Sequence, residues 1–98
     1  MHARLSRFAG LPPERLEETI REFEEEQLPA IEEQPGFAGF FMGVDYNAGR
    51  AAAISFWDSR EDMEASARMA GQARDQVAAT AQAPREPIVD QYEVVISK

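Results

Sequence analysis

Apolar and polar positions along the first third of the chain predict a strand followed by a helix. Residues 2–9 alternate between two sides, as in a β-strand, with Ser6 and Phe8 on the same side. Residues 10–13 (Gly-Leu-Pro-Pro) break the strand, and proline suits the first turn of the helix that follows. Pro29 is expected to bend the last turns of this helix, because proline removes a backbone donor. One helical face steps by three or four residues through Leu16, Ile20, Phe23, Gln27 and Ile31.

The middle of the chain predicts a β-hairpin. Residues 37–46 form its first strand, with Phe41 on one side and Phe40, Met42 and Val44 on the other. A loop at residues 47–49 then leads into a second strand at residues 50–57. This strand is apolar on both sides, with Ala51, Ala53 and Trp57 on one and Ala52, Ile54 and Phe56 on the other.

The last third predicts a helix and a final strand. Either Asp58 with Glu61, or Ser59 with Asp62, has the spacing of a capping box at the start of the helix. The helix is expected to end near residues 81–83. The final strand is expected at residues 88–97. The inner stripe of the helix is predicted to contain Met63, Ala67, Ala70 and Val77.

The predicted order βαββαβ indicates one α+β domain over residues 1–98 with a ferredoxin-like fold. In this fold two helices cover one face of a four-stranded antiparallel sheet. No residues are left to cover the other face, although several strands are apolar on both sides. An exposed apolar face of this size favours self-association. We therefore expect a homodimer, in which Asp in place of Phe40 or Val94 disrupts the contact if that residue faces the partner sheet.

Composition and charge narrow the function classes. The formal net charge of −8 opposes binding to a phosphate backbone, so no nucleic-acid partner is expected. Nine glutamates against two arginines at residues 14–33 are interpreted as a solvated helix face. The chain has no cysteine, no metal-ligand pattern, no signal-peptide pattern and no membrane-spanning stretch. A soluble cytoplasmic protein without a membrane partner is the expectation.

Three segments carry a resemblance to a known family. They are PGFAGFFMGVD at residues 35–45, AISFWDSRED at residues 53–62 and YEVVI at residues 92–96. With the order of elements, they make the chain similar to the antibiotic-biosynthesis-monooxygenase (ABM)-like group of the dimeric α/β-barrel superfamily. The resemblance implies two sheets packed into a dimeric barrel, and a ligand pocket between the helices and the sheet of each subunit. It does not supply a reaction.

The haem-degrading branch of this superfamily uses an Asn on the first strand, and a Trp and an iron-ligating His on the second helix. The positions that correspond here are Arg7, Ser66 and Gln76, and all three differ. The single histidine, His2, lies on a different element. Haem degradation is therefore not expected, and the resemblance to the oxygenases implies no cofactor.

Three residues are candidates for catalysis. If the resemblance holds, Arg7 projects from the first strand into the pocket, and Arg74 lies near the inner stripe of the second helix. A guanidinium facing a cavity suits a carboxylate, an enolate or a reduced-oxygen anion. The phenol of Tyr92 could donate to a substrate oxygen. The alternatives are that each arginine pairs with a carboxylate, such as Asp90 or Glu93, or extends to water, and that Tyr92 is a packing residue.

Aromatic and methionine side chains are candidates for the wall of an aromatic-binding pocket. The same residue types also build any core of this size. The candidates for the pocket wall are Phe23, Phe41, Trp57, Met63 and Met69.

Two functions fit these observations. The first is a cofactor-free monooxygenase-like enzyme acting on a small aromatic or quinone-like substrate. The second is a non-enzymatic homodimeric module that binds a small ligand or serves in assembly. An open cavity with convergent polar groups favours the first, and a filled or purely apolar cavity favours the second.

Overall fold

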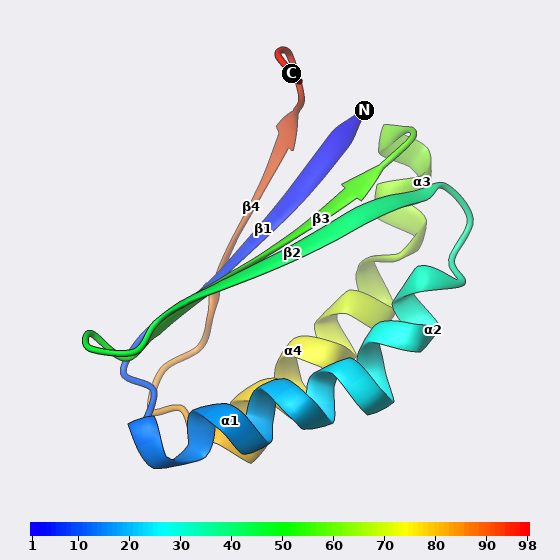
Figure 1. Ribbon diagram of the computed structural model, residues 1–98. Coiled ribbons are helices and arrows are strands. Elements are labelled where there is room, and N and C mark those ends of the chain that lie inside the picture. The colour runs from blue at the N-terminus through cyan, green and yellow to red at the C-terminus, as the bar shows by residue number, and fades with distance from the viewer.

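A computed structural model describes residues 1–98, that is, every residue of the sequence. The elements are β1 (His2–Phe8), α1 (Pro13–Glu22), the π-helical turn η1 (Phe23–Gln27), α2 (Leu28–Glu32), β2 (Phe37–Asp45), β3 (Arg50–Trp57), α3 (Arg60–Ala65), α4 (Ala67–Ala81) and β4 (Ile88–Glu93). The helices lie on one side of the sheet and leave the other side open (Figure 1). The predicted α+β ferredoxin-like architecture is confirmed.

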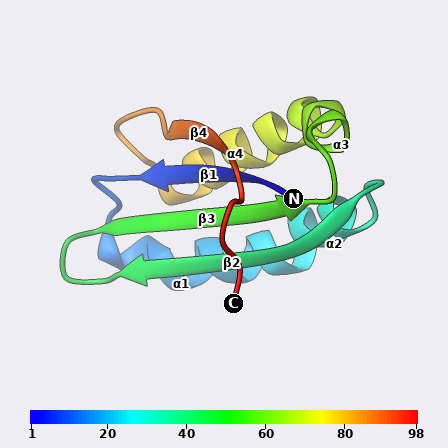
Figure 2. The same ribbon diagram turned by 90° about the horizontal axis from the view of Figure 1, so that it is seen from above.

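The four strands form one antiparallel sheet in the order β2-β3-β1-β4 (Figure 2). Directly opposed residues of antiparallel strands point to the same face, so the register assigns each side chain to a face. Phe40 lies opposite Ser55 and Met42 opposite Ala53, and these residues face the helices. Phe41 lies opposite Ile54 on the open face. The predicted two-sided pattern of the hairpin strands is confirmed.

The first predicted helix is continuous but not uniform. The amide of Leu28 donates to the carbonyl of Phe23, five residues back, and this widened turn lies directly before Pro29. Proline at this position cannot make the usual bond to the carbonyl four residues back. A π-turn accommodates such a mismatch without ending the helix. The sequence predicted a bend at Pro29, and the structure has the π-helical turn η1 directly before this residue, between α1 and α2.

The second predicted helix consists of two segments, α3 and α4, which meet at Ser66. Of the two capping possibilities, the structure has Ser59, whose side chain accepts a hydrogen bond of 3.1 Å from the Asp62 amide. The expectation that Ala67 lies on the inner stripe is wrong, because the helix restarts at this residue and Ala67 is exposed. Ala73 is buried instead.

The last strand is shorter than predicted. β4 ends at Glu93, opposite His2, because its neighbour β1 begins there. One further bond, from the Val94 amide to the Met1 carbonyl, closes the ladder at 2.9 Å. Val95 and Ile96 follow without a strand partner and are 82% and 75% exposed. The final residues leave the sheet on its open side (Figures 1 and 2).

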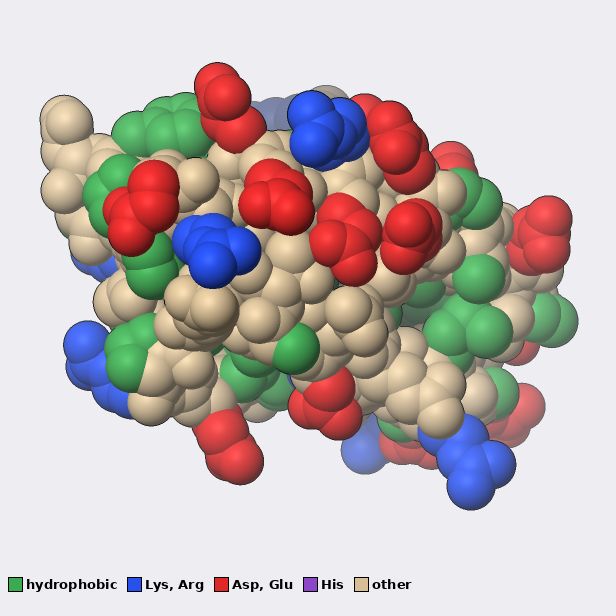
Figure 3. Space-filling view, turned by 90° about the horizontal axis from the view of Figure 1, so that it is seen from below, with side chains coloured by type: hydrophobic (Ala, Val, Ile, Leu, Met, Phe, Trp, Pro, Cys, Tyr) green, Lys and Arg blue, Asp and Glu red, His purple; other side chains and the backbone are tan.

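The core lies between the helices and the inner face of the sheet. Leu16, Trp57 and Met63 are its most deeply buried large side chains. Acidic side chains cover much of the outer surface of the helices (Figure 3), as the glutamates of residues 14–33 predict. No helix is both long enough and apolar enough to cross a membrane.

Candidate functional site

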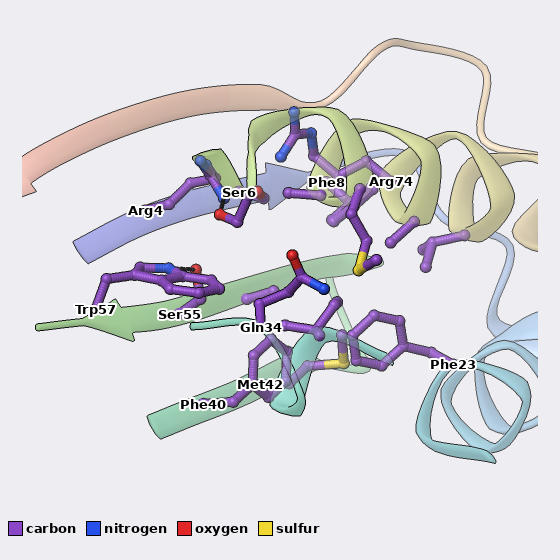
Figure 4. A pocket seen from close by; sticks show the side chains of 17 residues that line it. Arg4, Ser6, Phe8, Phe23, Gln34, Phe40, Met42, Ser55, Trp57 and Arg74 are labelled. Carbon is purple, nitrogen blue, oxygen red and sulfur yellow. Dashed lines mark hydrogen bonds between the residues drawn. The ribbon is translucent and has the colours of Figure 1, made fainter. Parts of the chain in front are cut away.

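A cavity lies between the helix layer and the inner face of the sheet (Figure 4). Its volume is about 50 Å³, which is room for a few water molecules. Most of its wall is apolar and comes from β1, β2, β3, the first helix and α4. The apolar lining is Phe8, Phe23, Ile31, Phe40, Met42, Ala53, Trp57, Met69, Ala70, Ala73 and Val77. The polar lining is Arg4, Ser6, Gln34, Ser55, Ser66 and Arg74.

Arg4 is held at the junction of α3 and α4. Its position in β1 faces the helices, and only 3% of the residue is exposed. One guanidinium nitrogen, Nη1, donates to Ser66 Oγ at 3.1 Å, and Nη2 donates to the Met63 carbonyl at 2.6 Å. Ser66 Oγ also donates to the Met63 carbonyl at 2.7 Å. The interruption of the helix thus supplies the acceptors that hold Arg4 in place.

The second buried polar contact fixes the indole of Trp57. Its Nε1 donates to Ser55 Oγ at 2.9 Å, and Trp57 is only 1% exposed. The ring of Phe37 packs against the indole edge to face, with ring centroids 5.7 Å apart. Trp57 therefore forms a rigid part of the cavity wall (Figure 4).

Arg74 enters the cavity from α4 and is half-buried. Its Nη2 passes 3.7 Å from the place where a Cβ on Gly71 would stand, so its side chain runs back along the helix toward the end where Arg4 lies (Figure 4). Burial lowers the pKa of Arg74, which the neighbouring charge of Asp75 partly offsets. Burial and then the charge of Arg74 lower the pKa of Arg4. Neither guanidinium has a carboxylate within 4.0 Å.

The cavity contains hydrogen-bond donors but no ordinary proton acceptor for catalysis. No histidine, tyrosine, aspartate or glutamate is among the residues that line it. Nowhere in the chain do three His, Asp or Glu side chains gather as metal ligands. The site can therefore hold an apolar body in its aromatic wall and an oxygen-bearing group at its arginine end.

The structure brings four of the predicted site residues together. Phe23, Trp57, Met69 and Arg74 all line the cavity. Met63 is buried beside it and contributes its backbone carbonyl to Arg4, whereas its side chain is not part of the wall.

The predicted placement of Arg7 is wrong. Arg7 lies opposite Ala52 and Ile88 on the open face, because side chains alternate along β1 and Phe8 faces the helices. Its Nη2 donates to Asp90 Oδ2 at 3.1 Å, and the two side chains are 53% and 38% exposed. This pair is the alternative that the sequence left open for Arg7.

Phe41 and Tyr92 also lie outside the cavity. Tyr92 is opposite Ala3 on the open face and is 53% exposed. Phe41 is on the same face, 68% exposed, and packs edge to face on Phe56 with ring centroids 6.0 Å apart. Their expected places in a pocket beneath the helices are therefore corrected.

Sequence reasoning missed the polar residues of the cavity apart from Arg74. Arg4 and Ser6 had one available signal, since both lie on the side of β1 that carries Phe8. Ser66 corresponds to a tryptophan of the haem degraders, and this correspondence does not predict a serine at the cavity. Ser66 lies at the cavity, whereas Gln76 is exposed and donates to Glu22 Oε1 at 3.3 Å.

No protein-family model and no curated protein sequence matches the chain. Solved structures do match. A candidate antibiotic biosynthesis monooxygenase from Deinococcus radiodurans superposes with a TM-score of 0.75 at 15% identity, over 100% of this chain and 96% of that one. The chain has the ABM-like fold.

Two further ABM-like folds were solved with ligands. A monooxygenase from Streptomyces coelicolor, in complex with nanaomycin D, has a TM-score of 0.72 at 12% identity and covers 99% of this chain and 92% of that one. The haem degrader MhuD from Mycobacterium tuberculosis, with two haems in its active site, has a TM-score of 0.67 at 22% identity, over 100% and 99% of the two chains. At these identities the likeness concerns the ABM-like fold alone.

Proposed function

We propose that this chain is an ABM-like monooxygenase whose cavity binds a small aromatic or quinone-like molecule. The observation that carries the proposal is the arrangement of the cavity, an aromatic and methionine wall with cationic and hydroxyl donors. Such a wall accepts a flat apolar body, and the donors orient its oxygen atoms. The nanaomycin complex of a protein with the same fold supports this class of ligand.

The proposed chemistry needs no cofactor. A carbon acid between aromatic rings loses a proton to a water molecule, and the resulting carbanion reduces O2 and forms a carbon–oxygen bond. Cleavage of the oxygen–oxygen bond then releases water and leaves a carbonyl, so that CH2 and O2 become C=O and H2O. The role of this chain is to bind the substrate, stabilise its negative charge and exclude bulk water.

A ring system needs more room than the cavity of about 50 Å³ offers. Binding therefore requires the helix layer to move away from the sheet. Both helices over the cavity are interrupted, one by η1 and the other at Ser66. π-turns and short helix breaks are common places for such adjustment.

The test is oxygen consumption with a panel of hydroquinones, naphthols and anthrones. The matched variants are Ala70→Leu, which fills the cavity, and Ala79→Leu, which adds the same atoms to an exposed position of α4. We expect oxygen uptake in the unmodified protein and in Ala79→Leu and a loss of it in Ala70→Leu. Equal oxygen uptake in Ala70→Leu and Ala79→Leu would mean that the reaction does not take place in this cavity.

A second candidate function is ligand binding without catalysis. The absence of histidine, tyrosine and carboxylates from the cavity lining favours it, because these are the usual general bases. It predicts that a panel ligand raises the melting temperature, with the Ala70→Leu variant insensitive to the ligand, and that no oxygen is consumed. A ligand at a hundred times its dissociation constant stabilises the fold by about 2.7 kcal/mol.

We also propose that two copies pack through their open sheet faces. Large apolar side chains are exposed there, among them Phe41 at 68%, Ile88 at 58% and Tyr92 at 53%. A second copy suits this face, because a two-fold axis packs the apolar open face of one subunit against the identical face of the other. The cytoplasmic location expected from the sequence stays a prediction.

A further inference from the structure

Arg4 and Arg74 place two positive charges at one cavity without a neutralising carboxylate. Four other arginines have such a partner: Arg7 pairs with Asp90, Arg15 with Glu18, Arg50 with Asp45 and Arg60 with Glu64. The remaining three also have no carboxylate within 4.0 Å, but they are exposed to water; they are Arg21, Arg68 and Arg85. Arg4 and Arg74 are thus the arginines that lack a partner and are also withdrawn from water, in a chain with 18 acidic and 10 basic residues. Because no carboxylate of the protein neutralises these two guanidinium groups, an anionic ligand would be stabilised at the cavity.

The protein holds one of these cations rigidly. Arg4 is 3% exposed, and neutral oxygens of Ser66 and Met63 accept its hydrogen bonds. These contacts orient the guanidinium but leave its charge uncompensated, and a buried charge without a counter-charge is costly. The second cation, Arg74, lies on the longer α4 segment and raises that cost, since like charges repel.

We propose that the substrate binds as an oxyanion, a phenolate or an enolate, whose charged oxygen lies between Arg4 and Arg74. The inference rests on the proposed function and names the ionic form of its substrate. The apolar body of the ligand lies against Phe23, Phe40 and Trp57, and its charged oxygen lies among the donors. Charge-assisted hydrogen bonds from a guanidinium stabilise such an oxygen.

This assignment accounts for the missing base. An opposite charge within about 4–6 Å lowers the pKa of an acidic group by about one to three units. Two guanidinium groups therefore favour ionisation of a phenol to its phenolate, or of the carbon acid to its enolate, and water takes up the proton. The anion is also the electron-rich form that can reduce O2. The cavity needs no histidine or carboxylate for this step.

The test uses 4-nitrophenol, whose anion is coloured, and its neutral methyl ether 4-nitroanisole. Binding of both is followed by the fluorescence of Trp57, the single tryptophan of the chain. Absorbance titration gives the pKa of the bound phenol. We expect this pKa to fall by about one to three units. Because each pKa unit is a tenfold preference for the anion, the phenolate should bind about ten to a thousand times more tightly than the neutral phenol.

Variants of Arg74 separate charge from packing. Arg74→Gln should reduce the pKa shift of the bound phenol, and Arg74→Lys should retain most of it. Arg68→Gln is the matched control, since Arg68 is exposed on the same helix and lies outside the cavity. It should leave the shift unchanged. Arg74 is used rather than Arg4, because loss of the Arg4 contacts to Ser66 and Met63 endangers folding.

Three outcomes would overturn the inference. In the first, nitrophenol and nitroanisole bind equally and the pKa of the phenol is unchanged. In the second, neither compound binds. In the third, Arg68→Gln has the same effect as Arg74→Gln, which assigns the effect to the general field of the protein. These outcomes do not decide the proposed function. Oxygen uptake that is lost in Ala70→Leu would still support the proposed function if the substrate binds in its uncharged form.

Discussion

At the scale of single residues, hydroxyl groups keep the larger side chains of the cavity in place. Ser66 and the Met63 carbonyl hold Arg4, and Ser55 holds the Trp57 indole. No buried side-chain nitrogen or oxygen lacks a hydrogen-bond partner. Removal of one hydroxyl leaves a buried donor unpaired, which costs more than an average hydrogen bond contributes.

Ser55→Ala should therefore destabilise the fold by about 1–3 kcal/mol, because the Trp57 N–H then has no acceptor within the core. Urea unfolding followed by Trp57 fluorescence measures the change. Ser97→Ala, in the exposed final segment, is the control and should have little effect. Equal stability of the two variants would show that the indole N–H finds another partner.

The sequence predicted which residues line the cavity only in part, and β1 shows why. Arg4 and Arg7 lie three positions apart, so alternation alone places them on opposite faces but does not say which face is covered. Phe8 is buried against the helices, and Arg4 lies on the same face of β1 because the two are four positions apart. The acceptors that make a buried arginine tolerable lie 59 and 62 residues further along the chain. No local pattern in β1 could reveal them.

At the scale of elements, the caps and the proline were readable from sequence, whereas the break at Ser66 was not. Pro29 and Ser59 act through backbone groups within four or five residues, which local patterns describe well. The break at Ser66 lies beside Arg4 from another element. Its site therefore depends on the tertiary fold.

Gly71 provides a test of how well α4 is packed. Glycine inside a helix costs about 0.5–1 kcal/mol relative to alanine. A Cβ at this position would meet only Arg74 Nη2, at an ordinary distance of 3.7 Å. Gly71→Ala should therefore stabilise the protein by about that amount, as measured by thermal or urea unfolding.

Gly36→Ala is the opposing control for this measurement. Its φ of +78° disfavours a side chain, and its Cβ would overlap the Asp62 carboxylate. It should lower the melting temperature. A destabilising Gly71→Ala would mean that the Arg74 side chain needs the space beside Gly71.

The β2–β3 hairpin has a pH-dependent contact. Asp45 accepts hydrogen bonds from Arg50 Nη2 at 2.9 Å and from the Ala48 amide at 3.0 Å. The Arg50 contact is the largest cause of the lowered pKa of Asp45. The unfolded chain thus binds the proton more readily than the folded one. The contribution of the Asp45 contact to the stability of the fold is complete above the ordinary aspartate pKa of about 3.9. It is lost as the pH falls through the lower pKa that Asp45 has in the folded protein.

The matched variant for this contact is Asp45→Asn, which keeps an acceptor for the Ala48 amide but removes the charge. Thermal unfolding at a series of pH values should show the unmodified protein as the more stable above about pH 4. The difference should narrow at lower pH. A difference that does not depend on pH would contradict the role of the Asp45 charge.

At the scale of the whole molecule, the sequence predicted the fold and the uncovered sheet face, because both follow from the period of the apolar residues. The structure adds which aromatic side chain lies on that face. Phe40 was a candidate for the partner contact, but it lines the cavity and its ring lies 5.3 Å from that of Phe23. Phe41 is the residue on the open face.

Phe41→Asp should therefore separate the proposed dimer into folded monomers. A charge within an apolar contact between two sheets is costly, whereas Phe41 contributes little to the core of the single chain, since it is 68% exposed. Sedimentation at micromolar concentration measures the mass, and circular dichroism checks the fold. Tyr46→Asp is the control, because Tyr46 is exposed in the loop after β2 rather than on the open face. It should remain dimeric. An unmodified protein that is monomeric and folded at this concentration would show that the apolar face is stable in water without a second copy.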